Sequence, residues 1–359
     1  MYRLNKGFYD GKPYNPLVGM GVDIGSLFTM TAISFKDLQN RIIIIDAHNV
    51  LHQFLSIIRQ RDGTPLKDTE GKITSHLSGL LYRTGTMIEQ HIRPVYIFDG
   101  APHPLKEQTI QTRKKRRLQA EEDWKDALEK GDLEKARTKA QQTSRVTDDI
   151  ITQSKELLHA LGIPYLQAPS EGEAQASYIV KKGDAYAVGS QDFDCLLLGT
   201  PVLVRNLTAS TKRKLPGKKA YRAVHPEQIK LKPNLKKLGI TQKQLVDMAI
   251  LIGTDFNTGI KGIGPKKSLT LIKKNGNVEN ALSTIGGEDT PTFDEIKEIR
   301  KIFLDPRVTD DYDFSWSTPD IKEVYHILCD QHQFRRDRID TALKKYESLK
   351  TMAKQQTLF

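Results

Sequence analysis

Residues 41–46 read RIIIID, residues 94–99 read PVYIFD and residues 185–194 read AYAVGSQDFD. Each stretch is a short aliphatic or aromatic run that ends in aspartate, a pattern typical of strands buried on both faces. Helical patterns lie between and after them, at residues 50–58, 75–90, 147–161 and 173–182, the last with Ser170 as its expected N-cap and Gly183 as its stop. Strands that alternate with helices predict an α/β fold with a mostly parallel central β-sheet flanked by helices.

The composition of the chain indicates a folded protein with a substantial core. Its 359 residues suggest two domains, or one with large insertions, and 38% hydrophobic residues exclude disorder over most of the length. No apolar run approaches the length of a membrane span, and the N-terminus lacks the apolar segment of a secretory signal. The two cysteines, Cys195 and Cys329, form no CxxC motif, which fits a reducing compartment. We expect no contact with a membrane.

The net charge of +11 is concentrated in one stretch of the chain. Residues 205–237 contain eleven Lys or Arg residues and the single acid Glu227. An excess of positive charge favours polyanionic partners, with nucleic acid first among them.

Acidic residues stand where the predicted elements begin or end. They follow the three strands, open the helix at 173–182 and follow an apolar helix that ends at Gly253; the seven are Asp46, Asp99, Glu171, Glu173, Asp192, Asp194 and Asp255. Any one of them alone is explained as a helix cap or a turn residue. All seven together are not explained as caps or turn residues, because the carboxyl ends of parallel strands meet at one edge of a sheet and would gather these acids there.

Seven carboxylates at one sheet edge would repel one another unless cations lay among them. All are oxygen ligands, which favours Mg²⁺ or Mn²⁺ over zinc. Two such ions close together can hold a phosphate, activate a water and stabilise the leaving oxygen. With basic surfaces nearby to bind phosphates, the pattern predicts a phosphodiesterase that acts on nucleic acid.

A charged segment interrupts the strand pattern at residues 103–145. It contains RKKRR at 113–117 and then a long run with few apolar residues, which suits exposed helices with ion pairs one turn apart. A solvated helical hairpin without a function is one interpretation, and a localisation signal at 113–117 is another.

A second DNA-binding signature follows the apolar helix at 245–252. Residues 259–274 read GIKGIGPKKSLTLIKK, which is typical of a helix-hairpin-helix motif. Its glycines, Gly262 and Gly264, allow close approach to phosphates, and amide groups at the next helix start bind the anion. Lys261, Lys266 and Lys267 add attraction that does not depend on base sequence.

Several strings are similar to those of one known family. FDGAPHPLK (98–106), QAPSEGEAQASYI (167–179), SQDFDCLLLG (190–199), VRNLT (204–208), KRKLPGKK (212–219) and GTDFNTGIKGIGPKK (253–267) closely resemble the flap endonucleases of the structure-specific 5′ nuclease superfamily, most of all the archaeal members. The resemblance begins at Met20 and runs almost to the end of the chain. It implies a PIN-like 5′ nuclease fold with a helical arch and a helix-hairpin-helix.

The resemblance also implies a division of the chain into regions. These are an N-terminal extension (1–19) expected to be disordered or not native, an N-terminal nuclease region (20–117), a helical arch (103–145), an internal nuclease region (140–258), the helix-hairpin-helix (245–275), a C-terminal helical region (276–350) and a tail (351–359). Within the basic stretch 205–237, it implies a β-hairpin and loop near duplex DNA, although a solvated basic loop remains an alternative.

Carried over residue by residue, the resemblance implies roles for the candidate residues. Asp46, Asp99, Glu171 and Glu173 would serve a first Mg²⁺, and Asp192, Asp194 and Asp255 a second, with Mn²⁺ able to substitute. Lys106 and Arg113 would contact the scissile phosphate, with phosphate steering as the alternative role. Arg59 and Arg83 would face the duplex, the helix-hairpin-helix would bind K⁺, and His52 stands where relatives commonly have a base-stacking Tyr.

The two ends of the chain carry further expectations. Met20-Gly21 matches the start of relatives, so we expect Met20 to be the working initiator, or the extension to be removed. At the other end, Gln355, Leu358 and Phe359 resemble the start of a sliding-clamp-binding peptide that lacks its usual aromatic pair, and a frayed terminus is the alternative.

The activity implied is a metal-dependent endonuclease that cuts near the base of a 5′ flap on branched duplex DNA, with possible 5′→3′ exonuclease activity. It would serve Okazaki-fragment maturation and long-patch base excision repair, as a monomer, in the cytoplasm of an archaeon or the nucleus of a eukaryote. The alternatives are a gap endonuclease or 5′→3′ exonuclease of the same superfamily, and a non-catalytic DNA-junction binder. The full set of seven acids argues against a binder, because repulsion at a phosphate-binding surface weakens binding.

Overall fold

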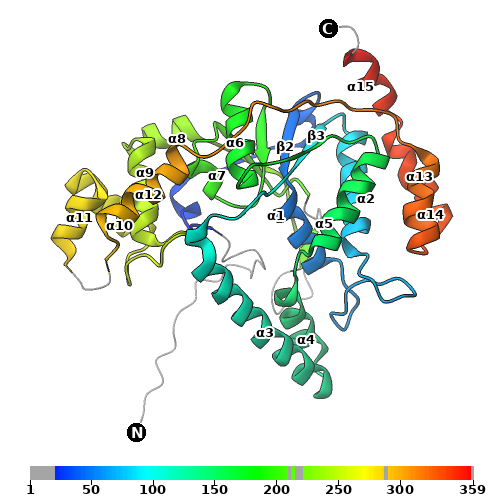
Figure 1. The fold of residues 1–359 in the computed structure, drawn as a ribbon, viewed down its shortest axis with the longest axis horizontal. Coiled ribbons are helices and arrows are strands. Elements are labelled where there is room, and N and C mark those ends of the chain that lie inside the picture. Colours follow the sequence, from blue (N-terminus) through cyan, green and yellow to red (C-terminus); the bar gives the residue numbers. More distant parts are fainter. Residues whose placement is uncertain (1–20, 209–211, 215–220, 287–289, 357–359) are drawn as a thin grey trace.

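A seven-stranded mixed sheet lies at the centre of the protein, with strand order β1-β9-β6-β5-β2-β3-β4 (Figure 1). The computed structural model describes residues 21–208, 212–214, 221–286 and 290–356, so the expected extension at 1–19 and Met20 lie outside the described residues. The strands are β1 (Thr31–Ala32), β2 (Ile42–Asp46), β3 (Arg93–Phe98), β4 (Tyr165–Gln167), β5 (Ala187–Gly189), β6 (Val202–Arg205) and β9 (Glu227–Lys230). A separate hairpin pairs β7 (Lys212–Lys214) with β8 (Tyr221–Ala223) inside the basic stretch.

The prediction of a mostly parallel sheet flanked by helices is confirmed. The central strand β2 pairs in parallel with β3 and β5, and β3–β4 and β5–β6 are also parallel, whereas β6–β9 and β9–β1 are antiparallel. Ile43, Ile44 and Ile45 of β2 have no exposed surface. The unbroken isoleucine run is explained by this burial, because a strand covered on both faces needs no polar side chain.

Helices surround the sheet and extend the fold on both sides. They are α1 (Ala47–Ile57), α2 (Ser75–Glu89), α3 (Glu107–Glu129), α4 (Leu133–Ala140), α5 (Asp148–Ala160), α6 (Gly172–Lys182), α7 (Asp194–Leu197), α8 (Leu231–Leu238), α9 (Gln242–Ile252), α10 (Pro265–Asn275), α11 (Val278–Ile285), α12 (Phe293–Leu304), α13 (Ile321–Tyr325), α14 (Arg336–Leu343) and α15 (Leu349–Gln356). Helices α1, α2 and α6 pack directly on the central strands, and α9 packs against α10, α11 and α12.

Two details of the predicted elements are wrong. The strand expected at 185–194 is only β5, because the chain turns after Gly189 and Asp194 already begins helix α7. The N-cap of α6 is Glu171 and not Ser170, although the helix does end at Gly183 in the left-handed conformation (φ 95°). The polar run Ser190–Phe193 therefore forms a loop, which carries Asp192 beyond the end of the strand.

The segment expected to be an exposed excursion is a helical hairpin, α3 and α4, that projects from the body of the protein (Figure 1). The two helices pack through small buried residues, Ala120, Ala127, Ala136 and Ala140. The indole Nε1 of Trp124 donates to the backbone oxygen of Asp62 at 3.0 Å, and this contact ties the hairpin to the loop after α1. We call α3 and α4 the arch.

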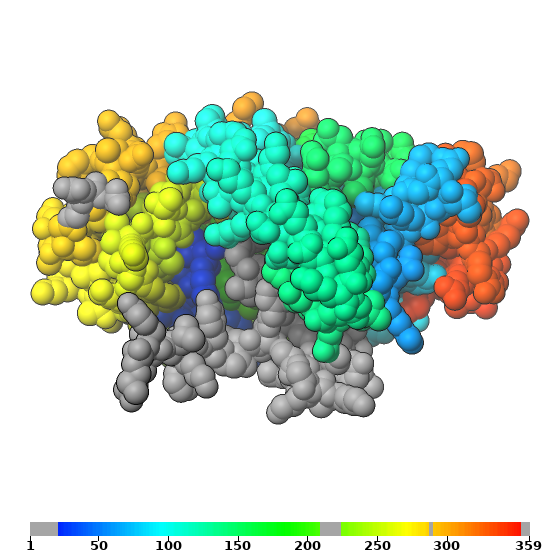
Figure 2. Space-filling model, turned by 90° about the horizontal axis from the view of Figure 1, so that it is seen from below, coloured from blue at the N-terminus to red at the C-terminus, as the bar shows by residue number. Residues whose placement is uncertain are grey.

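The C-terminal part of the chain is helical and crosses the molecule. After α12, residues 305–320 run without regular structure to α13, and α14 and α15 follow at the opposite end (Figure 1). A view from below shows the first described residues in the gap between the arch and the segment around α10 (Figure 2). Among the described residues, no helix is both long enough and apolar enough to span a membrane.

Candidate active site

The carboxyl edge of the parallel strands brings the predicted acids toward one another. Asp46 ends β2 and caps α1, and Asp99 directly follows β3. Glu171 and Glu173 lie at the start of α6, and Asp192 and Asp194 lie at the start of α7. Asp255 follows α9, which ends at Gly253, where φ is 107°.

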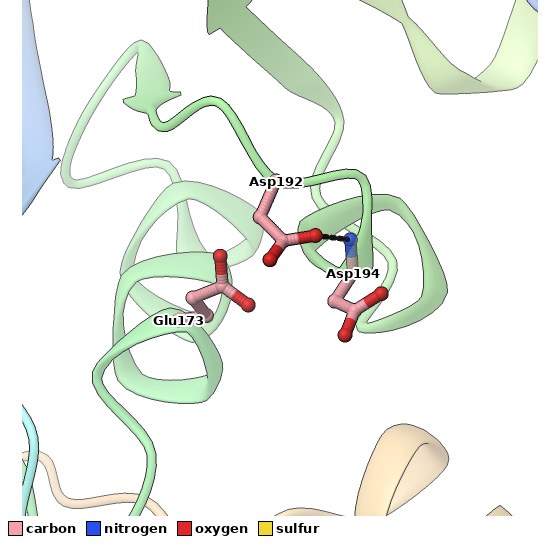
Figure 3. A group of neighbouring side chains, drawn as sticks. All are labelled: Glu173, Asp192 and Asp194. Atoms are coloured by element: carbon pink, nitrogen blue, oxygen red, sulfur yellow. Dashed lines mark hydrogen bonds between the residues drawn. The ribbon is translucent and has the colours of Figure 1, made fainter. Parts of the chain in front are cut away.

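Three of these acids form a tight group. Oxygen atoms of Glu173, Asp192 and Asp194 all lie within 4.8 Å of one another, and the three side chains converge on one space (Figure 3). The amide of Asp194 donates to Oδ1 of Asp192 at 3.2 Å, which fixes the second carboxylate relative to the first. This separation suits carboxylates that share a hard cation.

Ser190 links this group to Asp46. Its Oγ lies 3.3 Å from Oδ2 of Asp46 and 3.2 Å from Oε1 of Glu173, and it accepts the amide hydrogen of Asp192 at 3.1 Å. The hydroxyl can donate to only one of the two carboxylates at a time. The side chain of Ser190 therefore contacts acidic residues from three different segments.

Asp99 is positioned by its neighbours at the other side of the site. Its Oδ1 accepts the amide hydrogen of Gly172 at 2.7 Å, and its Oδ2 lies 3.3 Å from Nδ1 of His48. Gly172 allows this approach because it has no Cβ, and a Cβ there would lie only 2.7 Å from the same carboxylate oxygen. The loop after β3 and the start of α6 are joined by this contact.

The buried carboxylates resist losing their protons. Burial first, and then the neighbouring Asp99 carboxylate, raise the pKa of Asp46 to about 6. Burial and the charge of Asp255 raise the pKa of Asp194 to about 6, and burial with adjacent carboxylates raises the pKa values of Glu173 and Asp192 well above their ordinary range. A site of this kind prefers either protons or bound cations, so the donor set fits divalent metal ions with oxygen ligands.

Two cations from the base of the arch face the acids. Lys106 pairs with Glu171 and lies 3.8 Å from Oδ2 of Asp255, and Nη2 of Arg113 donates to Oδ1 of Asp255 at 2.6 Å. Burial would lower the pKa of Lys106, but the carboxylates of Glu171 and Asp255 outweigh it and keep that pKa above its ordinary value. Lys106 therefore stays charged beside the acids.

The start of the described chain also reaches the acids. The amide of Val22 donates to Oδ1 of Asp194 at 2.8 Å. Gly21 has φ 74°, and a Cβ there would lie 1.8 Å from Oδ1 of Asp192. Only glycine fits at this position without displacing a carboxylate of the site.

The predicted DNA-binding residues lie outside the acid group. Lys261, Lys266 and Lys267 are exposed around the turn between α9 and α10, where Gly262 has φ 81° and Gly264 is the N-cap of α10. Gly264 itself has extended backbone (φ −105°, ψ −175°), so it needs no left-handed freedom.

Three further predicted DNA contacts come from α1, the residues that follow it, and α2. His52 lies within 3.4 Å of Ser144 Oγ, and burial lowers its pKa to about 4. Arg59 donates to the backbone oxygens of Leu55 and Gly63, and Arg83 lies half-buried on α2. In the tail, Leu358 and Phe359 lie outside the described residues, whereas the backbone of Gln355 belongs to α15.

Sequence reasoning missed several residues of the site. His48 and Ser190 were not predicted, although each lies within two residues of a predicted acid. Cys195 was treated only as a marker of compartment, yet its thiol lies 3.4 Å from Oε1 of Glu173, and burial followed by that carboxylate raises its pKa well above the ordinary value. The adjacency of His48 and Ser190 to the acidic motifs was the available signal for both.

Comparison with known proteins identifies close relatives of the chain. Residues 23–120 match the XPG N-terminal domain and residues 162–255 match the XPG I-region. Flap endonuclease 1 of Archaeoglobus fulgidus is 50% identical over 92% of this chain and 97% of its own length. The flap endonuclease 1 of Methanothermobacter thermautotrophicus is 47% identical over 93% and 98%.

Solved structures show the same likeness. Flap endonuclease-1 from Methanococcus jannaschii superposes with a TM-score of 0.73 at 40% identity, covering 92% of this chain and 98% of that one. The catalytic core of Rad2 in complex with DNA substrate gives a TM-score of 0.64 at 25% identity, over 90% and 97%.

Proposed function

The chain belongs to the flap endonuclease family and is a structure-specific 5′ flap nuclease, and we propose that it cuts branched DNA with two divalent metal ions held by the seven acids. The convergence of Glu173, Asp192 and Asp194 carries this proposal, because three ionised carboxylates so close together need cations between them. Bound Mg²⁺ or Mn²⁺ would polarise the scissile phosphate and activate the attacking water.

The chain's own residues would bind and orient the phosphate. The charged groups of Lys106 and Arg113 already pair with Glu171 and Asp255. Both can therefore turn to an incoming phosphodiester and stabilise the negative charge that develops on it. Ser190 would keep Asp46 and Glu173 in fixed relative positions during the reaction. No side chain is required to form a covalent intermediate.

Residues outside the acid group would hold the rest of the substrate. The turn at Gly262 and Gly264, with its exposed lysines, would grip the duplex backbone and accept a K⁺ ion. Arg59 and Arg83 would lie along the duplex. His52 is neutral near pH 7, since burial lowers its pKa to about 4, and a neutral ring suits stacking on a base.

The family also supports proposals about the cellular role. We infer that the protein takes part in Okazaki-fragment maturation and long-patch repair, with 5′→3′ exonuclease activity as a secondary reaction. The C-terminal segment with Gln355 is proposed to bind a sliding clamp. We propose that the enzyme is a monomer and that it acts in the cytoplasm, a location that fits the archaeal source of the relatives.

A labelled 5′ flap incubated with magnesium tests the proposed mechanism. The unmodified protein is expected to release the flap, and Asp192→Ala to lose turnover while DNA binding stays equal or becomes stronger, because one repelling charge is removed. Asp294→Ala, at an exposed carboxylate on α12, is the matched control and should cut normally. Undiminished cutting by Asp192→Ala would overturn the role of the acids.

A further inference from the structure

A cavity of about 410 Å³ opens beside the acids on the side of α12. Lys106, Glu171, Glu173 and Asp194 form one end of it, so it is continuous with the proposed metal site. The other end is formed by the C-terminal half of α12 and the residues that follow that helix. Its volume is in the range of sites that bind small organic molecules, and a single nucleotide is of that size.

Aromatic rings line this cavity and connect it to the residues just before the arch. The ring of Phe256 lies edge-on to those of Phe303, at 5.5 Å, and His103, at 5.9 Å. Nζ of Lys106 lies 5.3 Å from the centre of the Phe256 ring. Glu298 of α12 lies 3.5 Å from His103 just before the arch. A ligand in the cavity would therefore touch the same structural unit that holds Lys106.

Two cations line the far end of the cavity. Lys301 and Arg307 both line it and are exposed, and neither has an ion pair or a side-chain hydrogen bond within the part of the chain that the structure describes. Asp305 lies on the same rim and reduces the local positive charge, whereas the charge of Glu298 already faces His103. The free cations are suited to one phosphate group rather than to a long polyanion.

The residues proposed to hold duplex DNA lie elsewhere. None of Arg59, Arg83, Lys261, Lys266 and Lys267 lines the cavity. The cavity begins at His103 and Lys106, directly before α3, so it adjoins the root of the arch. Because the duplex is assigned to those other residues, the part of a flapped substrate that can occupy the cavity is the single strand next to the scissile phosphate.

We propose that this cavity binds the flap nucleotide next to the scissile phosphate, with Lys301 and Arg307 holding the phosphate on the 5′ side of that nucleotide. This inference rests on the proposed flap-cutting function and adds a binding site to it. The nucleotide bound there is the one whose 3′-oxygen leaves when the phosphodiester is hydrolysed. Its contact with Phe256 and Lys106 would align the scissile phosphate with the acids.

The test uses two substrates that differ in one group. Both have a one-nucleotide flap on the same nicked duplex, and the flap ends in a 5′-phosphate in one and a 5′-hydroxyl in the other. The unmodified protein is expected to show a kcat/KM higher for the phosphorylated flap by roughly tenfold, the size of a contact between charged groups. The double variant Lys301→Ala/Arg307→Ala should lower that kcat/KM to the value for the hydroxyl flap.

Lys297→Ala is the matched control, since Lys297 is exposed on α12 but does not line the cavity. It removes one positive charge from the helix that also carries Lys301 and should keep the preference, and thermal melting checks that all variants are folded. Equal rates for the two flaps in the unmodified protein, or a preference that survives in the double variant, would overturn the proposal. Failure of the unmodified protein to cut either flap in magnesium would instead contradict the proposed function.

Discussion

The backbone amide of Val22 donates to Oδ1 of Asp194 at 2.8 Å, so the beginning of the described chain is built into the wall of the acid site. Its neighbour Gly21 lies against the carboxylate of Asp192. The first described segment is thus part of the proposed active site, and changes there should alter cleavage as well as stability.

Gly21→Ala tests this relationship. The added Cβ would lie 1.8 Å from Oδ1 of Asp192, so Asp192 must move, and we expect the single-turnover cleavage rate to fall by roughly 100-fold. Gly71→Ala is the control, because Gly71 also has positive φ (85°) but has open space around its Cβ position. It should cost only about 1 kcal/mol of stability from backbone strain and leave the rate unchanged. Equal rates for the two variants would contradict the proposed contact.

Lys106→Ala is expected to lower the cleavage rate at saturating DNA by roughly 100-fold or more, the usual cost of removing a group that stabilises developing charge. The control is Lys114→Ala, which removes an exposed lysine from α3, the helix that begins directly after Lys106, and should change the rate little. Rapid-quench measurements separate the chemical step from DNA binding. If the cleavage rate falls by the same factor in both variants and a higher DNA concentration restores both rates, Lys106 only steers the substrate.

The raised carboxylate pKa values predict how the metal-free protein responds to pH. In the folded protein the pKa values of Asp46 and Asp194 are about 6, above those of the same groups in the unfolded chain. The folded state then binds protons that the unfolded state has released, so this contribution to stability is present below about pH 4 and is lost as pH rises through 6.

In the presence of a chelator, the melting temperature should therefore fall by roughly 3 °C or more as the pH rises from about 5 to about 7.5. Magnesium should raise it again, and more at the higher pH, because cations replace the lost protons. Asp192→Asn removes one of the repelling charges and should flatten both responses. A melting temperature that rises with pH under chelation would contradict the arrangement of buried acids described above.

The arch should depend on its contact with the loop after α1. Trp124→Phe removes the hydrogen bond to the backbone oxygen of Asp62 but keeps a ring, and Trp124→Ala removes both. We expect limited proteolysis within residues 107–140 to become faster in the order wild type, Trp124→Phe, Trp124→Ala, while the melting temperature of the protein changes little. Flap cleavage should decrease in the same order. Unchanged proteolysis of Trp124→Ala would show that the arch stays in place without this contact.

Much of the fold and of the acid site could be predicted from local patterns. The isoleucine run of β2 indicates burial on both faces, and the rule that parallel strands share a carboxyl edge brings Asp46 and Asp99 together. Gly183 and Gly253 end their helices as expected, because each supports a backbone conformation that other residues adopt at a cost.

The rest depends on contacts between distant segments, which leave no local pattern. Ser190 has the sequence context of an ordinary loop residue, and only the approach of β2 to α6 gives its hydroxyl two carboxylate neighbours. The early end of β5 was missed because the stretch 185–194 ends in aspartate like the other two strand sequences, and this likeness outweighed the polar residues after Gly189. The docking of Trp124 on Asp62 joins positions whose sequence gives no sign of their contact.

The acids of the site come from segments that stretch from the end of β2 to the residue after α9. During synthesis on the ribosome, Asp46 would emerge long before Asp255, and the helix that positions Asp255 is among the later elements of the chain. A growing polypeptide that lacks this helix would hold only part of the proposed metal site. The order of the elements along the chain would thus keep the nascent nuclease harmless to nearby nucleic acids until most of it has been made.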